Sequence, residues 1–191
     1  PILGLEAYLN PHPRASPLAK NDKTRYHLTI LAKNITGYKN LLKLTTIGWL
    51  EGFYYKPRID IEALQKHREG LVVLSGCLSS ELCQTILHAS PKKAKEVATR
   101  YQKSVGAENF FLEIQHHPEI EDYQKVRETL IELSDELNIP LVATPELHPA
   151  DVIAGITSSH LSGVRILFVN MPLRETARPN VTPEGPLLLA T

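Results

Sequence analysis

The chain has 191 residues, of which 42% are hydrophobic and 22% are charged, and its formal net charge is zero. This composition is typical of a globular domain and excludes collagen-like and highly charged disordered chains. No stretch approaches the roughly 20 apolar residues that a membrane span needs, so we expect no membrane association. Two cysteines, Cys77 and Cys83, are too few for a secreted disulfide scaffold and favour a reducing, cytoplasmic location.

Runs of β-forming residues alternate along the chain with amphipathic segments. In chain order, the predicted strands are residues 2–9, 26–33, 71–74, 110–115 and 141–144. Several of these runs are almost entirely apolar, as in strands that are covered on both faces of a parallel sheet. The alternation predicts an α/β protein with parallel strands.

The segments between the strands carry helix signals. Predicted helices cover residues 35–49, 61–67, 91–105 and 119–137, and residues 10–25 are expected to form a surface loop. Ser90 and Pro91 mark the start of the third helix, and Gly106 marks its end. We expect one domain over residues 1–148, followed by a tail of unknown structure over residues 149–191.

Side chains that can bind metals occur near the predicted strand ends, where α/β proteins commonly place their active sites. Carboxylate, imidazole and thiolate are the groups that hold zinc, manganese or iron. Clustered metals of this kind can clamp a phosphate ester and supply a bound hydroxide. For most of these residues taken alone, an ordinary structural role is the better explanation. The candidates, in chain order, are Glu6, His27, Cys77, His116, His117, Glu146 and His148.

A second cluster is the sequence GFYYKPR at residues 52–58. Its two cations, Lys56 and Arg58, could hold a phosphate group, and the same residues could instead cover the mouth of a barrel. Both interpretations remain open from the sequence. Cys83 lies in a predicted helical stretch and is expected to be a packing residue.

Six segments of the chain occur in the order and at the intervals of a known family. They are PILGLEAYL, YHLTILAKNITGYKNLLKL, LEGFYYKPRID, GLVVLSGCLSSEL, NFFLEIQHH and IPLVAT. Over roughly residues 1–144 the chain resembles the PHP domain of bacterial DNA polymerase III alpha subunits. The resemblance implies a distorted (β/α)7 barrel, incomplete in this chain, with a metal centre at the carboxyl ends of its strands.

The resemblance also implies a ligand set. Its Gly-x-Glu, histidine and Ser-Gly-Cys motifs fall on Glu6, His27 and Cys77, and its last ligand pair falls on Glu146 and His148. Glu146 stands where the family has aspartate. The expected cofactor is a divalent metal, with zinc ahead of manganese. The family's first histidine motifs would precede residue 1, so we expect a piece of a longer chain that holds an incomplete site.

By this resemblance the parent protein is a DNA-directed DNA polymerase of bacterial replication. Its expected partners are the rest of the alpha subunit, the other replicase subunits and DNA. Two alternatives remain: an independent metal-dependent phosphoesterase, and a non-catalytic docking module. The docking module would use the basic first third of the chain, since residues 1–60 hold nine Lys and Arg against four Asp and Glu.

Overall fold

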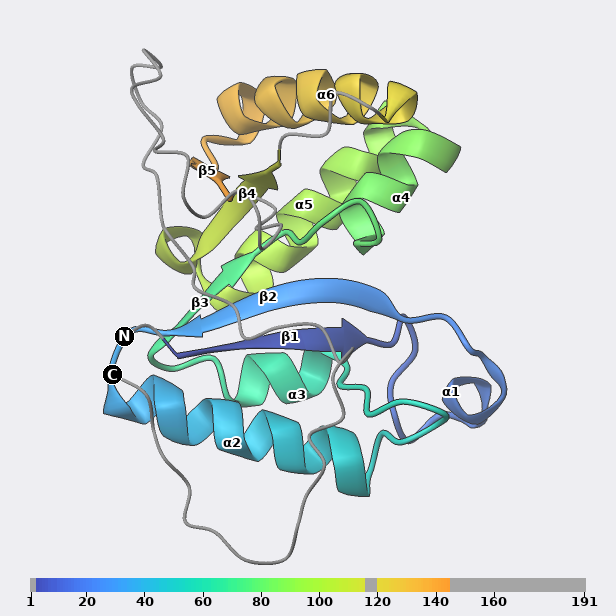
Figure 1. The fold of residues 1–191 in the computed structure, drawn as a ribbon, viewed down its shortest axis with the longest axis vertical. Helices are drawn as coiled ribbons and strands as arrows, with labels where there is room; N and C mark the ends of the chain where they lie inside the picture. The colour runs from blue at the N-terminus through green and yellow to red at the C-terminus, as the bar shows by residue number, and fades with distance from the viewer. Residues whose placement is uncertain (1–2, 116–119, 145–191) are drawn as a thin grey trace, which may run out of the picture.

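A computed structural model describes residues 3–115 and 120–144 of the chain (Figure 1). The elements, in order, are β1 (Gly4–Leu9), α1 (Pro17–Asn21), β2 (Tyr26–Ala32), α2 (Ile35–Leu50), α3 (Ile61–Lys66), β3 (Leu71–Leu74), α4 (Glu81–His88), α5 (Pro91–Val105), the 3-10 helix η1 (Ala107–Asn109), β4 (Phe110–Ile114), α6 (Glu121–Leu137) and β5 (Leu141–Ala143). The α/β class is confirmed, and all five predicted strands are present. Within the described residues, no helix is long and apolar enough to cross a membrane.

The five strands form one mixed sheet in the order β1-β2-β3-β4-β5. β1 and β3 both run antiparallel to β2, whereas β3, β4 and β5 run parallel to one another. The expectation that all strands are parallel is therefore wrong for half of the pairings. Apolar runs indicate burial but not direction. β3 starts at Leu71, opposite the end of β2 at Ala32, and so runs back along β2. A closed barrel is not seen in the described residues.

Side-chain caps fix where several helices begin. Asn34 accepts a hydrogen bond from the backbone N–H of Gly37 at the start of α2, and Asp60 accepts one from Ala63 at the start of α3. Ser90 caps α5 just before Pro91, and Gly106 ends that helix with a φ of 98°, as the sequence predicted. The short helix α1 was missed, because it lies inside the segment predicted to be a loop.

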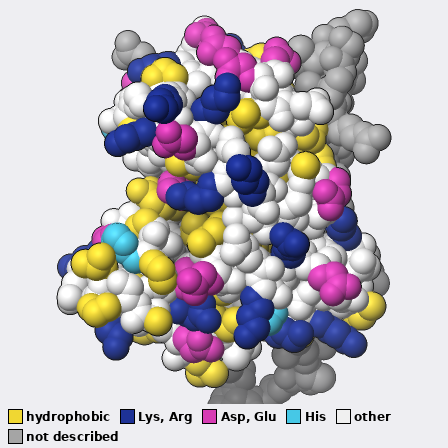
Figure 2. Space-filling view, turned by 180° about the vertical axis from the view of Figure 1, so that it is seen from behind, with side chains coloured by type: hydrophobic (Ala, Val, Ile, Leu, Met, Phe, Trp, Pro, Cys, Tyr) yellow, Lys and Arg dark blue, Asp and Glu magenta, His cyan; other side chains and the backbone are white. Residues whose placement is uncertain are grey.

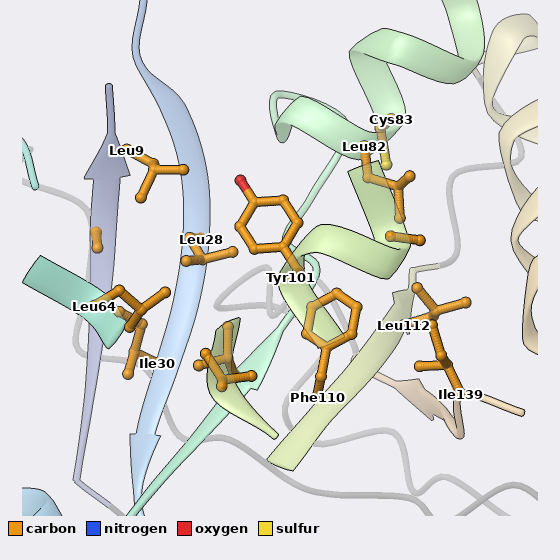
Figure 3. Close-up of a cluster of buried hydrophobic side chains, with 14 of the residues drawn as sticks. Leu9, Leu28, Ile30, Leu64, Leu82, Cys83, Tyr101, Phe110, Leu112 and Ile139 are labelled. Carbon is orange, nitrogen blue, oxygen red and sulfur yellow. The ribbon is translucent and has the colours of Figure 1, made fainter. Parts of the chain in front are cut away.

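The helices lie against the two halves of the sheet. α2 contacts β2 and β3, while α5 contacts β3 and β4, and α6 contacts β4 as well as α4 and α5. In the core, the rings of Tyr101 and Phe110 are stacked with their centroids 5.6 Å apart. Figure 3 shows these rings between Leu28 of β2 and Leu112 of β4. One continuous core therefore joins the antiparallel half of the sheet to the parallel half.

Two glycines of α2 provide a matched test of this packing. A Cβ atom on Gly37 would lie 1.9 Å from the backbone oxygen of Gly70, whereas on Gly48 it would meet nothing closer than 3.5 Å. We expect Gly37→Ala to lower the free energy of unfolding by about 2 kcal/mol or more, because the backbone of residue 70 must move. Gly48→Ala should raise it by up to about 1 kcal/mol through helix propensity. Chemical denaturation measures both, and equal effects would contradict this packing of α2.

Candidate metal centre

Glu6 and His27 lie on the same face of the β1–β2 ladder. Glu6 is opposite Thr29 and Tyr8 is opposite His27 in the antiparallel register. Opposite residues of an antiparallel pair, and residues two apart in one strand, share a face. Glu6 and His27 are therefore diagonal neighbours, and their side chains meet with 2.8 Å between Glu6 Oε1 and His27 Nδ1.

Cys77 reaches the same nitrogen from the other side of β2. Its Sγ lies 3.5 Å from His27 Nδ1. His27 is the second residue of β2, and β3 runs antiparallel to β2, so the beginning of β2 lies beside the segment that follows β3. The predicted grouping is thus present for Glu6, His27 and Cys77. The expected reason, the shared carboxyl ends of parallel strands, does not apply to β1 and β2.

Gly76 makes the approach of Cys77 possible. It adopts a φ of 88°, and a Cβ atom at this position would lie 2.6 Å from the backbone oxygen of His27. An L-residue is strained at that φ and has no room there. The backbone N–H of His27 also donates to the oxygen of Ser79, at 3.2 Å. The Ser-Gly-Cys sequence therefore serves to bring this backbone against the start of β2.

The surroundings of His27 favour its charged form. The hydrogen bond with Cys77 and then the hydrogen bond with Glu6 raise the pKa of His27 to about 9, against the opposing effect of partial burial. The ring also meets Tyr8 edge-on, with centroids 5.1 Å apart. In the absence of metal, the three side chains are therefore organised around a proton on Nδ1.

The donor types suit a divalent metal, but their arrangement is that of hydrogen-bonded partners. No group of three His, Cys, Asp or Glu side chains is arranged to hold a metal ion within residues 3–115 and 120–144. Ligands of tetrahedral zinc at bond lengths of about 2.0–2.3 Å lie roughly 3.3–3.7 Å apart. The 3.5 Å between His27 and Cys77 fits that spacing, whereas the 2.8 Å between His27 and Glu6 is a hydrogen bond. Glu6, whose side chain is 45% exposed, has room to move outward.

The remaining proposed ligands, Glu146 and His148, lie outside the described residues, as do His116 and His117. Their metal roles stay predictions. Cys83 is buried in α4, and burial raises the pKa of its thiol to about 12, which agrees with the packing role expected of it.

Sequence reasoning missed a polar group in the middle of the sheet. Glu113 of β4 is only 4% exposed, and its carboxylate accepts hydrogen bonds from Thr29 and Thr144. Burial raises the pKa of Glu113, and the hydrogen bonds from Thr144, Thr29, Gln115 and the backbone of Gly76 act against this rise. The available signal was one acidic residue in the otherwise apolar strand FFLEI.

The two cations of the GFYYKPR segment differ in their surroundings. Arg58 is 4% exposed, and its guanidinium donates to the backbone oxygens of Asp22 and Ala19 at 2.6 and 2.7 Å. Lys56 is exposed. A pocket of about 360 Å³ beside Arg58 has none of the three candidate metal ligands in its lining. Arg58 therefore has a structural role here, and phosphate binding at Lys56 and Arg58 stays a prediction.

Replacement of these two cations should show which of them has a structural role. Arg58→Met leaves buried carbonyls without donors and should lower the free energy of unfolding by on the order of 3 kcal/mol. Lys56→Met should change it by less than about 0.5 kcal/mol. Thermal or chemical denaturation measures both. A large loss of stability for Lys56→Met, or none for Arg58→Met, would contradict these roles.

The raised pKa of His27 can be tested by NMR titration of the metal-free chain. Cys77→Ala and Glu6→Ala should each lower the pKa of His27 from about 9 toward the ordinary 6.5, because each removes a hydrogen-bond partner. The protonated ring stabilises the fold fully below pH 6.5, and this contribution is lost as the pH rises through 9. His67 serves as the control, since burial and then Lys43 lower its pKa independently of this site. An unmodified chain in which His27 titrates near 6.5 would refute this geometry.

Comparison with known proteins identifies the family of the chain. Residues 1–117 match the PHP domain family. The chain is 42% identical over 151 residues to the DNA polymerase III subunit alpha of Treponema pallidum, and 44% identical over 151 residues to that of Borreliella burgdorferi. It is 41% identical over 150 residues to that of Thermus aquaticus. These alignments cover 78% of this chain and 12–13% of each relative. The chain therefore belongs to the PHP domain family and is homologous to the PHP-domain region of DNA polymerase III alpha subunits.

Proposed function

We propose that this chain is part of the PHP domain of a replicative DNA polymerase III alpha subunit. In that subunit it contributes a metal-stabilised scaffold. The observation that carries the proposal is the meeting of Glu6 and Cys77 at one nitrogen of His27. The relatives named above are polymerase subunits, and this chain spans about an eighth of their length. On the same basis, the proposal includes nucleotide addition by the whole subunit, contacts with DNA and with other replicase subunits, and a cytoplasmic location.

The residues proposed to hold the metal are Glu6, His27 and Cys77, together with Glu146 and His148. A thiolate and an imidazole favour zinc over manganese, which prefers oxygen ligands. A divalent metal bound at such a site can polarise a phosphate ester and lower the pKa of water. In this chain, His27 must give up the proton on Nδ1, and Cys77 must be a thiolate, before both can act as ligands.

The scaffold role rests on what the described ligands connect. Glu6 belongs to β1, His27 to β2, and Cys77 to the segment after β3. A metal held by all three would join three neighbouring parts of the sheet, including the edge strand β1. Such a cross-link stabilises the fold whether or not a substrate reaches the site.

Two other functions predict experimental results that differ from those of a scaffold. An independent metal-dependent phosphoesterase would hydrolyse a small phosphate ester, and His27→Ala would abolish that activity. A docking module would bind partners through basic surface. Figure 2 shows Lys and Arg interspersed with Asp and Glu on one face of the molecule, so this face has no broad patch of one sign.

Metal binding tests the proposal. We expect the purified chain to bind close to one equivalent of zinc. His27→Ala and Cys77→Ser should each weaken binding by at least 10-fold, because each removes a direct ligand. Binding should strengthen as the pH rises toward 9, since zinc competes with the proton on His27. His88→Ala, at the last turn of α4, is the control.

The outcome also separates the alternatives. Zinc that raises the unfolding temperature without phosphatase activity supports the scaffold. Zinc-dependent hydrolysis of a phosphate ester, lost in His27→Ala, would replace it with the phosphoesterase. A chain that binds neither zinc nor manganese between pH 7 and 9 would refute the metal site.

A further inference from the structure

Glu113 occupies an unusual place for a carboxylate. It lies in the interior of the sheet on β4, and its strand neighbours Leu112 and Phe110 are fully buried. A buried carboxylate is costly unless a cation or several hydrogen bonds compensate it. Each of the partners that the structure shows for Glu113 is a neutral donor. A salt bridge therefore does not account for its place in the core.

The hydrogen bonds of Glu113 engage both carboxylate oxygens. Oε1 accepts from Thr144 Oγ1 at 2.6 Å and from Gln115 Nε2 at 3.2 Å. Oε2 accepts from Thr29 Oγ1 at 3.2 Å. The backbone N–H of Gly76 also favours the charged form of this carboxylate. These groups fill most of the roughly four acceptor positions of an ionised carboxylate.

Three of these donors belong to the segments that carry the candidate ligands. Thr29 lies two residues after His27 in β2 and shares its face of the sheet. Gly76 directly precedes Cys77. Thr144 directly follows β5 and is two residues before Glu146 in the sequence. The hydrogen bonds of Glu113 therefore reach β2 near His27, the segment that leads to Cys77, and the end of β5.

The backbone of Glu113 strengthens this arrangement. Its N–H donates to the Oγ of Ser75, at 2.9 Å. The N–H of Ser75 in turn donates to the oxygen of Phe111, at 2.9 Å. Ser75, which leads to Gly76 and Cys77, is therefore tied to β4 by the backbone of Glu113 and of Phe111.

We propose that Glu113 is a positioning residue of the metal centre, whose carboxylate holds β2, the Ser-Gly-Cys segment and the end of β5 in the register that ligation needs. This inference rests on the proposed function for its metal. Glu113 acts through other residues, because its oxygens are occupied by hydroxyl and amide donors. Mutation of residues that orient metal ligands from outside commonly lowers metal affinity by 10- to 100-fold.

Glu113→Gln is the direct test, because it keeps the size of the side chain and turns one acceptor oxygen into a donor that must face existing donors. Cobalt is the probe, since its bond to a thiolate gives an absorption band that reports Cys77. We expect cobalt affinity to fall by about 10-fold or more, with a changed band. Glu132→Gln, an exposed residue of α6, is the matched control and should leave both unchanged.

Thr144→Val and Thr29→Val carry the test if Glu113→Gln does not fold. Each removes one hydroxyl donor and retains the shape of the side chain, and each should weaken cobalt binding by severalfold. Wild-type affinity and an unchanged band in folded Glu113→Gln, or in both threonine variants, would overturn the proposal even if their unfolding temperatures fell.

A chain that binds no cobalt would defeat the proposed function, and the metal-free protein then decides this inference separately. The ring signals of His27 in NMR spectra at a fixed pH report its contacts with Glu6 and Cys77. Altered His27 signals in Glu113→Gln, with unaltered signals in Glu132→Gln, support positioning. Identical His27 signals in Glu113→Gln and wild type would overturn it.

Discussion

The antiparallel pairing of β2 with β3 is the constraint on which the site depends. It places the start of β2, where His27 lies, beside the segment that follows β3 and carries Cys77. The backbone of Gly76 fits against the oxygen of His27 where no side chain would fit. Pairing of β1 with the other edge of β2 then brings Glu6 to the same nitrogen. Reversal of β2 would move His27 to the opposite end of the sheet. The site is therefore a product of strand direction as much as of residue identity.

The two polar clusters of the sheet stabilise charges of opposite sign. At the surface, His27 is stabilised as a cation by Cys77 and Glu6, so a proton holds the three side chains together. In the interior, Glu113 is surrounded by neutral donors, which compensate a buried carboxylate without introducing a second charge. Thr29 links the two clusters, since it pairs with Glu6 across the β1–β2 ladder and donates to Glu113. A change in either cluster can therefore reach the other through one residue of β2.

Much of the secondary structure could be predicted because its signals are local. Ser90, Pro91 and Gly106 mark the ends of α5 by capping chemistry alone, and the apolar runs locate all five strands. Strand direction could not be predicted in this way, because a buried strand has the same apolar pattern in either orientation. The side chains of Glu6, His27 and Cys77 meet as expected, but the expected reason, the shared carboxyl ends of parallel strands, fails at β1 and β2. The expectation therefore depended on family resemblance. Glu113 was missed because its significance comes mainly from partners 84 and 31 residues away along the chain.

The proposed metal and the Glu113 carboxylate would connect different but overlapping parts of the sheet. The hydrogen bonds of Glu113 connect β2, the segment after β3, β4 and the residue that follows β5, but they do not reach β1. The side chains of Glu6, His27 and Cys77 connect β1, β2 and the segment after β3. Both sets share β2 and the Ser-Gly-Cys segment, so together they span all five strands. An edge strand such as β1 has a partner on one side only and is the strand most in need of a further tie. A metal bound by Glu6 would hold β1 to the rest of the sheet. A scaffold role therefore accounts for a ligand on the edge strand, and it does not require that a substrate enter the site.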